Sequence, residues 1–232
     1  MDTTQRAGGI AGLIGAATFA VGMVMAVTVL SDYAMDDPQP PEAVRFLVDH
    51  QAITYLWNTI IFIVFGAALV VLVLALHKRL IGRSSFTVQA ATAFGLIWAG
   101  LMFAAGMIAN IGLGAVVDLH ATDLVSAKTV WSSLDAVQNG LGGGIEVVGG
   151  IWVLLVSWAA LRADALPNAS SYLGIAAGVA GLVTVVPALE TVGAVFGLGL
   201  IVWFTWVGIV LLQTPTESHQ DSSHTPRVHA TT

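Results

Sequence analysis

Apolar residues in this chain are arranged in six long runs that contain almost no charged side chains. An α-helix needs about 20 predominantly apolar residues to cross the roughly 30 Å hydrocarbon core of a bilayer. Each run is about that long, so the pattern predicts an all-α fold: an integral membrane bundle of about six transmembrane helices. The third run is the longest and must tilt, protrude or break, with Gly112 and Gly114 marking the expected region. The runs are Ala7–Leu30, Thr54–Leu76, Val88–Val117, Leu141–Leu161, Tyr172–Leu189 and Val192–Leu212.

The two long polar connections contain weaker helical patterns. Residues 31–53 begin with a proline cluster that a helix interior does not tolerate, and Glu42–His50 then has the spacing of a short amphipathic helix. Residues 118–139 are polar but compatible with a helix folded against the ends of the spans. We therefore expect short amphipathic helices in the two long outer loops of a single transmembrane helical domain over residues 1–212. Residues 213–232 lack hydrophobic periodicity and are expected to form a disordered cytoplasmic tail.

Composition excludes several classes of protein. Hydrophobic residues make up 56% of the 232 residues and charged residues only 9%, whereas a soluble domain carries about 25% charged residues. The absence of cysteine excludes disulfides, thiolate nucleophiles and cysteine-based metal sites. A net charge of −6 argues against nucleic acid as a partner. Membrane lipid is therefore the partner that composition predicts.

The distribution of positive charge predicts the orientation in the membrane. The first apolar run is longer than the apolar core of a signal peptide, so we expect it to be retained as a helix. Six spans then place both termini on one side, and that side carries six of the eight basic residues. The positive-inside rule makes this side cytoplasmic, in a multi-pass protein of the cell membrane. The six are Arg6, Lys78, Arg79, Arg83, Arg162 and Arg227, against Arg45 and Lys128 on the other side.

One predicted helix carries a stripe of polar side chains. At 100° per residue, Asp135, Asn139 and Glu146 fall within roughly 40° of one another on the fourth helix. Lipid does not tolerate such a stripe, so it must face the bundle or water. Measured along their helices, Glu146, Glu190 and Asn58 lie roughly 24–30 Å from the inner ends of their spans, and Asn110 lies in the outer half of its run. The candidate ligand-binding residues are therefore Asp135, Asn139, Glu146, Glu190, Asn58 and Asn110.

Two interpretations of these polar residues stay open. The first is a polar pocket that opens to the outer face, where a carboxyl group in apolar surroundings would carry a proton or bind a cation. The second is structural, with the side chains bonding neighbouring helices at the wet interface. His50, Asp118 and His120 are weaker candidates for metal ligands, because they are few and lack a metal-binding spacing. No cofactor is identified by any motif.

The second half of the chain resembles a known family. Residues 142–152 read Gly-Gly-Gly-Ile-Glu-Val-Val-Gly-Gly-Ile-Trp, followed by Leu-Pro-Asn at 166–168, Tyr-Leu-Gly at 172–174 and Val-Pro-Ala-Leu-Glu at 186–190. With Arg-Ala-Gly opening the first run, this is similar to a family of small prokaryotic multi-pass membrane proteins known only as a domain of unknown function. The resemblance implies a bundle of six or seven helices and no particular activity.

Three classes of function fit these observations. The first is a protein that binds or transports a small molecule, ion or proton in the outward-facing polar pocket. The second is a non-catalytic subunit or scaffold, because small residues recur at four-residue spacing and would let helices pack against a second copy or a partner membrane subunit. The third is a membrane-embedded enzyme acting on a lipid or apolar substrate, with or without a metal. We favour the first.

Overall fold

The computed structural model describes residues 3–34, 39–81, 85–143 and 146–213, which form helices and turns with no strand among them. Each of the six apolar runs contains a helix, so the predicted all-α class is confirmed. Two π-helical segments and one 3-10 helix interrupt the α-helices. The elements are α1 (Thr3–Val27), α2 (Ser31–Ala34), α3 (Pro40–Asp49), α4 (Gln51–Asn58), π-helix η1 (Thr59–Val64), α5 (Phe65–Leu80), α6 (Ser85–His120), α7 (Leu124–Gln138), π-helix η2 (Asn139–Gly143), α8 (Val147–Ala163), α9 (Asn168–Val183), 3-10 helix η3 (Pro187–Val192) and α10 (Gly193–Gln213).

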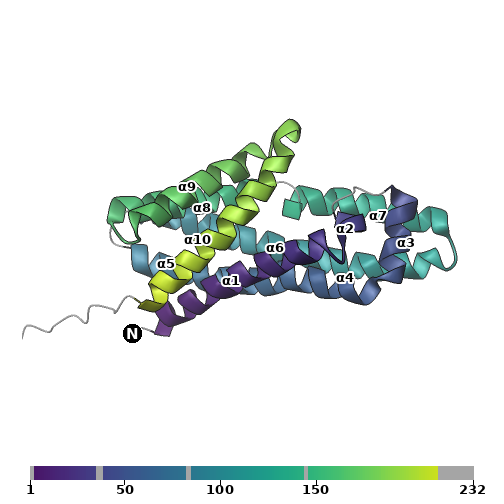
Figure 1. The fold of residues 1–232 in the computed structure, drawn as a ribbon, viewed down its shortest axis with the longest axis horizontal. Helices are drawn as coiled ribbons and strands as arrows, with labels where there is room; N and C mark the ends of the chain where they lie inside the picture. The colour runs from purple at the N-terminus through teal and green to yellow at the C-terminus, as the bar shows by residue number, and fades with distance from the viewer. Residues whose placement is uncertain (1–2, 35–38, 82–84, 144–145, 214–232) are drawn as a thin grey trace, which may run out of the picture.

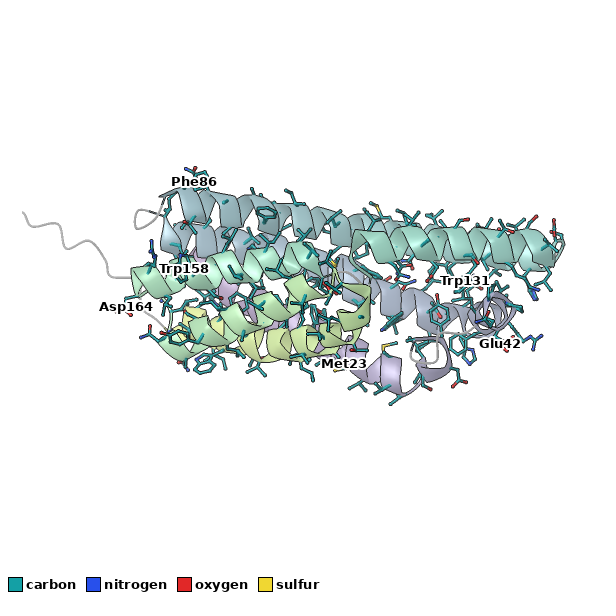
Figure 2. All side chains as sticks on the ribbon, turned by 90° about the horizontal axis from the view of Figure 1, so that it is seen from above. Met23, Glu42, Phe86, Trp131, Trp158 and Asp164 are labelled. Atoms are coloured by element: carbon teal, nitrogen blue, oxygen red, sulfur yellow. The ribbon has the colours of Figure 1, made fainter. Side chains whose placement is uncertain are left out.

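The molecule is elongated, and its two ends differ (Figure 1). We call the end where α1 begins and α10 finishes the terminal end; the end of α5, the start of α6 and the α8–α9 turn also lie there. We call the opposite end, which is formed by α2, α3 and α7, the distal end. Figure 2 labels Phe86, Trp158 and Asp164 at the terminal end and Glu42 and Trp131 at the distal end.

Four helical stretches are long and apolar enough to cross a membrane. They are Thr3–Val27, Gln51–Leu80, Phe86–His120 and Gly193–Gln213. Two further apolar helices, α8 with 17 residues and α9 with 16, fall just short. Large apolar side chains also lie exposed along these helices, as in α1, where Val24 is 59% exposed, and α10, where Val202 is 53% exposed. Such surfaces are compatible with a membrane protein and unfavourable in water.

The long third run forms one continuous helix. At 1.5 Å per residue, the 36 residues of α6 extend about 54 Å, far more than the roughly 30 Å of hydrocarbon. The helix does not break at Gly112 or Gly114. Instead it continues into the distal end, where its Leu113 and Val116 bury against Val44, Leu47 and Ala127 of α3 and α7. Of the three outcomes expected from its length, a break is therefore excluded.

Small residues form two tight seams between the chain's own helices. In the first, α1 packs on α10, where a side chain on Gly12 would lie 3.0 Å from the backbone of Gly208. In the second, α8 packs on α9, where a side chain on Gly150 would lie 2.7 Å from the carbonyl oxygen of Gly178. Backbones approach this closely only where no Cβ intervenes. The glycine spacing seen in the sequence is therefore used inside the monomer.

Basic side chains fasten the terminal end. The guanidinium of Arg79, at the end of α5, donates two hydrogen bonds of 3.0 and 2.9 Å to the carbonyl oxygen of Ala165. Lys78 donates to Thr4 over 3.3 Å. Arg162 lies 5.0 Å from the ring centre of Trp158, in a cation–π arrangement. The hydrogen bonds join the end of α5 to the start of α1 and to the turn that follows α8, and the cation–π contact lies within α8.

Candidate functional site

A cavity of about 1010 Å³ occupies the middle of the molecule, on the distal side of its aromatic core. Its walls come from α1, the α4–η1 stretch, α6, α7 and the start of α10. This volume is at the upper end of the range of small-molecule sites, which is about 300–1,000 Å³. The polar and aromatic-polar residues that line it are Thr18, Tyr33, Thr54, Trp57, Asn58, Trp98, Trp131, Asp135, Gln138, Asn139, Glu146 and Thr191.

Asp135 and Asn139 reach the cavity from the end of α7. They are one helical turn apart, and the amide nitrogen of Asn139 donates a 3.2 Å hydrogen bond to the Asp135 carboxylate. Asn139 begins the π-helix η2, so the backbone winds more loosely from this residue onward. The pair therefore presents one carboxylate, tied by an amide, at the wall of the cavity.

Glu146 reaches the same cavity from the start of the next helix, α8. The predicted stripe assumed one continuous helix, and this was wrong: α7 ends at Gln138 and α8 starts only at Val147. The backbone N–H of Glu146 donates a 2.9 Å hydrogen bond to the Thr184 hydroxyl, which attaches this segment to the end of α9. Among the described residues, no group forms a hydrogen bond with the Glu146 carboxylate. The side chain is partly buried and lines the cavity.

Asn58 contributes a buried amide to the opposite wall. Its side chain is only 5% exposed, it lines the cavity, and none of the described residues forms a hydrogen bond with it. Its amide atoms are not among the side-chain atoms that are fully buried without a partner, so they are accessible from the cavity. Asn58 is the last residue before the π-helix Thr59–Val64. π-helical turns often mark functional sites, and sequence periodicity gave no signal of this one.

The structure places Asn110 elsewhere. It is not among the residues that line the cavity, and its amide nitrogen donates a 3.4 Å hydrogen bond to the Thr59 hydroxyl. Its amide oxygen is buried without a partner in the described part of the chain. The side chain of Asn110 therefore connects α6 to the start of the π-helix η1 and does not line the cavity.

The remaining candidates stay outside the cavity or outside what the structure describes. Glu190 belongs to the 3-10 helix Pro187–Val192, and its side chain lies outside the described part of the molecule. His50 stacks on Phe46 with ring centres 4.2 Å apart. Asp118 and His120 are not among the residues that line the cavity. Within the described residues, no three acidic or histidine side chains converge as a metal site would require.

Aromatic rings close the cavity toward the terminal end. Phe65 and Trp98 line it with ring centres 5.1 Å apart, and Phe19 packs edge-on against Phe65 at 4.9 Å. Behind them the fully buried Trp152 and Trp203 continue the cluster. We call this cluster the aromatic floor. This cluster could not be predicted from the sequence, because apolar runs do not show which of their rings meet.

A second group of rings closes the distal side. The indole N–H of Trp131 donates a 3.5 Å hydrogen bond to the Tyr33 hydroxyl, and Tyr33 stacks on Phe46 with ring centres 5.6 Å apart. Burial raises the pKa of Tyr33, the hydrogen bond from Trp131 opposes this, and the negative charge of Asp135 raises the pKa further. The field of Asp135 therefore reaches across this side of the cavity.

A hydrogen bond also fixes the side wall. The indole N–H of Trp57 in α4 donates to the carbonyl oxygen of Gly22 in α1 over 3.1 Å. Gly22 is needed there, because a side chain at this position would meet Ile61 at 2.5 Å. Trp57 therefore joins two walls of the cavity, α1 and α4.

Comparison with known proteins adds no assignment. No protein-family model, curated protein or solved structure matches the chain. The resemblance to a family of unknown function therefore stays a prediction.

Proposed function

We propose that this chain is a multi-pass membrane protein that binds a small molecule in the cavity between α1, α4, α6, α7 and α10. The observation that carries the proposal is the side-chain amide of Asn58, which shares a cavity of about 1010 Å³ with the carboxylates of Asp135 and Glu146 and forms no hydrogen bond with the described residues. Polar side chains that converge on one largely apolar cavity are typical of ligand sites.

Six spans are part of the proposal. The 17 residues of α8 and the 16 of α9 extend about 26 and 24 Å, close to the thickness of a thin bilayer. With six spans both termini share one face. Lys78, Arg79 and Arg162 lie at the terminal end, which supports a cytoplasmic terminal end and a cavity that opens on the outer face.

Binding is favoured over transport in the conformation described. The aromatic floor separates the cavity from the terminal end, so a molecule that enters the cavity has no polar route onward. Passage across the membrane would require Phe65 and Trp98 to move apart. In a transport cycle, this conformation would correspond to the outward-facing one.

The alternative of a scaffold loses its main sequence argument. The small-residue faces that would dock a partner are already occupied, α1 by α10 and α8 by α9. A scaffold also needs no cavity lined by carboxylates and amides. The binding function explains both observations.

Native mass spectrometry with elemental analysis, on protein released from native-lipid nanodiscs, tests the proposal. We expect the wild-type protein to carry a stoichiometric bound molecule, which Ala109→Trp removes by filling the cavity. Val71→Trp serves as the matched control, because Val71 is exposed on α5 and does not line the cavity. A clean unliganded mass for the wild type would favour the scaffold. A bound molecule that Ala109→Trp retains would show that the cavity does not hold it.

A further inference from the structure

The cavity has a strongly one-sided charge. Asp135 and Glu146 line it, and none of the lining residues in the described part of the chain is Lys, Arg or His. Asn58 and Asn139 add amide oxygens that accept hydrogen bonds. Charges in a low-dielectric cavity act more strongly than in water, so the cavity concentrates positive charge and repels anions.

The rest of the lining is aromatic and apolar. Tyr33, Trp57 and Trp131 line the cavity at its side and at its distal end. Phe65 and Trp98, which belong to the aromatic floor, line it toward the terminal end. The faces of such rings attract cations within about 6 Å of the ring centre, most strongly when the cation is weakly hydrated. An aromatic lining with two carboxylates therefore suits a cation that has an apolar body.

A bare metal ion fits this lining less well. Metal ions need several oxygen or nitrogen ligands that converge on one point, and the described residues bring no such group together. A phosphate-bearing lipid headgroup also fits poorly. Its anion would face two carboxylates, and none of the described lining residues is a Lys, Arg or His that could pair with the phosphate. The lining thus selects by charge as well as by polarity.

We propose that the occupant of this cavity is an organic cation, with a quaternary or protonated nitrogen, or another delocalised positive centre, on an apolar body. The inference rests on the proposed function and specifies the ligand class of the same site. The positive centre lies near Asp135 and Glu146, and the apolar body lies against the aromatic floor.

The test compares two ions of the same shape and opposite charge. Tetraphenylphosphonium and tetraphenylborate are measured by equilibrium dialysis against the protein in an uncharged maltoside detergent, with empty micelles subtracted. We expect the wild type to bind the phosphonium, and Asp135→Asn/Glu146→Gln to weaken that binding by about tenfold or more. The control Glu42→Gln/Asp49→Asn removes the same charge from exposed positions and should bind like the wild type.

The outcomes separate the ligand class from the cavity. Equal binding of the phosphonium by the wild type and by Asp135→Asn/Glu146→Gln, preferential binding of the borate, or no binding of either ion would overturn the cation proposal. Ala109→Trp decides about the cavity itself. If it abolishes the binding of whichever ion is bound, the cavity remains a ligand site of another charge preference. If it leaves that binding unchanged, the proposed function fails as well. Melting temperatures confirm that each variant is folded.

Discussion

Gly208 lies where α10 crosses α1, and the backbone there leaves no space for a side chain. A Cβ on Gly208 would lie 2.9 Å from the carbonyl oxygen of Gly9 and 3.1 Å from the backbone nitrogen of Leu13. Backbone atoms cannot rotate away as a flexible side chain can. The close approach of these two helices therefore requires that Gly208 has no side chain, as it does at Gly12.

Gly208→Ala should lower the free energy of unfolding by about 1–3 kcal/mol, because the added methyl overpacks the seam between α1 and α10. Gly100→Ala is the matched control, since a Cβ at Gly100 meets nothing within 4 Å. The measurement is the loss of helix during denaturant titration in detergent, monitored by circular dichroism. Equal unfolding midpoints for the two variants would contradict the seam.

Some candidate residues could be found from the sequence and others could not. Asn58, Asp135, Asn139 and Glu146 could be singled out because polar groups in apolar runs must face something other than lipid, and all four line the cavity. That they bind a ligand stays a prediction. Asn110 obeys the same rule but turns to Thr59, because depth along a helix does not fix which neighbour a side chain meets. Ring-to-ring packing in the aromatic floor gave no sequence pattern.

At the scale of the element, α7 begins with a well-formed cap. Asp123 accepts hydrogen bonds from the backbone N–H groups of Val125 and Ser126 at 3.0 and 3.1 Å, and from the Ser126 hydroxyl at 2.6 Å. These bonds, led by the one from the Ser126 side chain, lower the pKa of Asp123. The helix that carries Asp135 thus depends at its start on an ionised carboxylate.

Asp123→Ala should raise amide hydrogen exchange through the first turns of α7. The pH dependence follows from the sign of the shift, because the pKa of Asp123 is lower in the folded protein. The cap therefore stabilises α7 above the unfolded pKa, and this stabilisation is lost as the pH falls through the folded pKa. Protection factors of residues 125–130, compared between neutral and strongly acidic pH, check this. If protection does not change with pH in the wild type, the capping account is wrong.

The elements show where periodicity alone is insufficient. A hydrophobic run gives the length of a helix but not its winding, so the π-helices Thr59–Val64 and Asn139–Gly143 could not be foreseen. The same limit explains why Asp135 and Glu146 were predicted on one helix, although Asp135 belongs to α7 and Glu146 precedes α8. The expected proximity still held, because both segments border one cavity.

At the scale of the whole molecule, two different packings meet at the cavity. Toward the terminal end, glycine seams and the aromatic floor pack the helices closely. Toward the distal end, α6 extends beyond this core, and α3 and α7 form a second small apolar cluster against it. The cavity lies between the two. We propose that this space is a water-accessible binding site that opens on the outer face.

The lack of cysteine makes a direct test simple, since a single introduced cysteine is the only thiol in the chain. The measurement is the labelling of Ala109→Cys and Val71→Cys in intact cells by a membrane-impermeant cationic methanethiosulfonate. We predict that Ala109→Cys, in the cavity wall, reacts from outside, and that Val71→Cys, exposed on α5, does not. A lack of reaction at Ala109→Cys, or a reaction that occurs only after the cells are made permeable, would contradict the account.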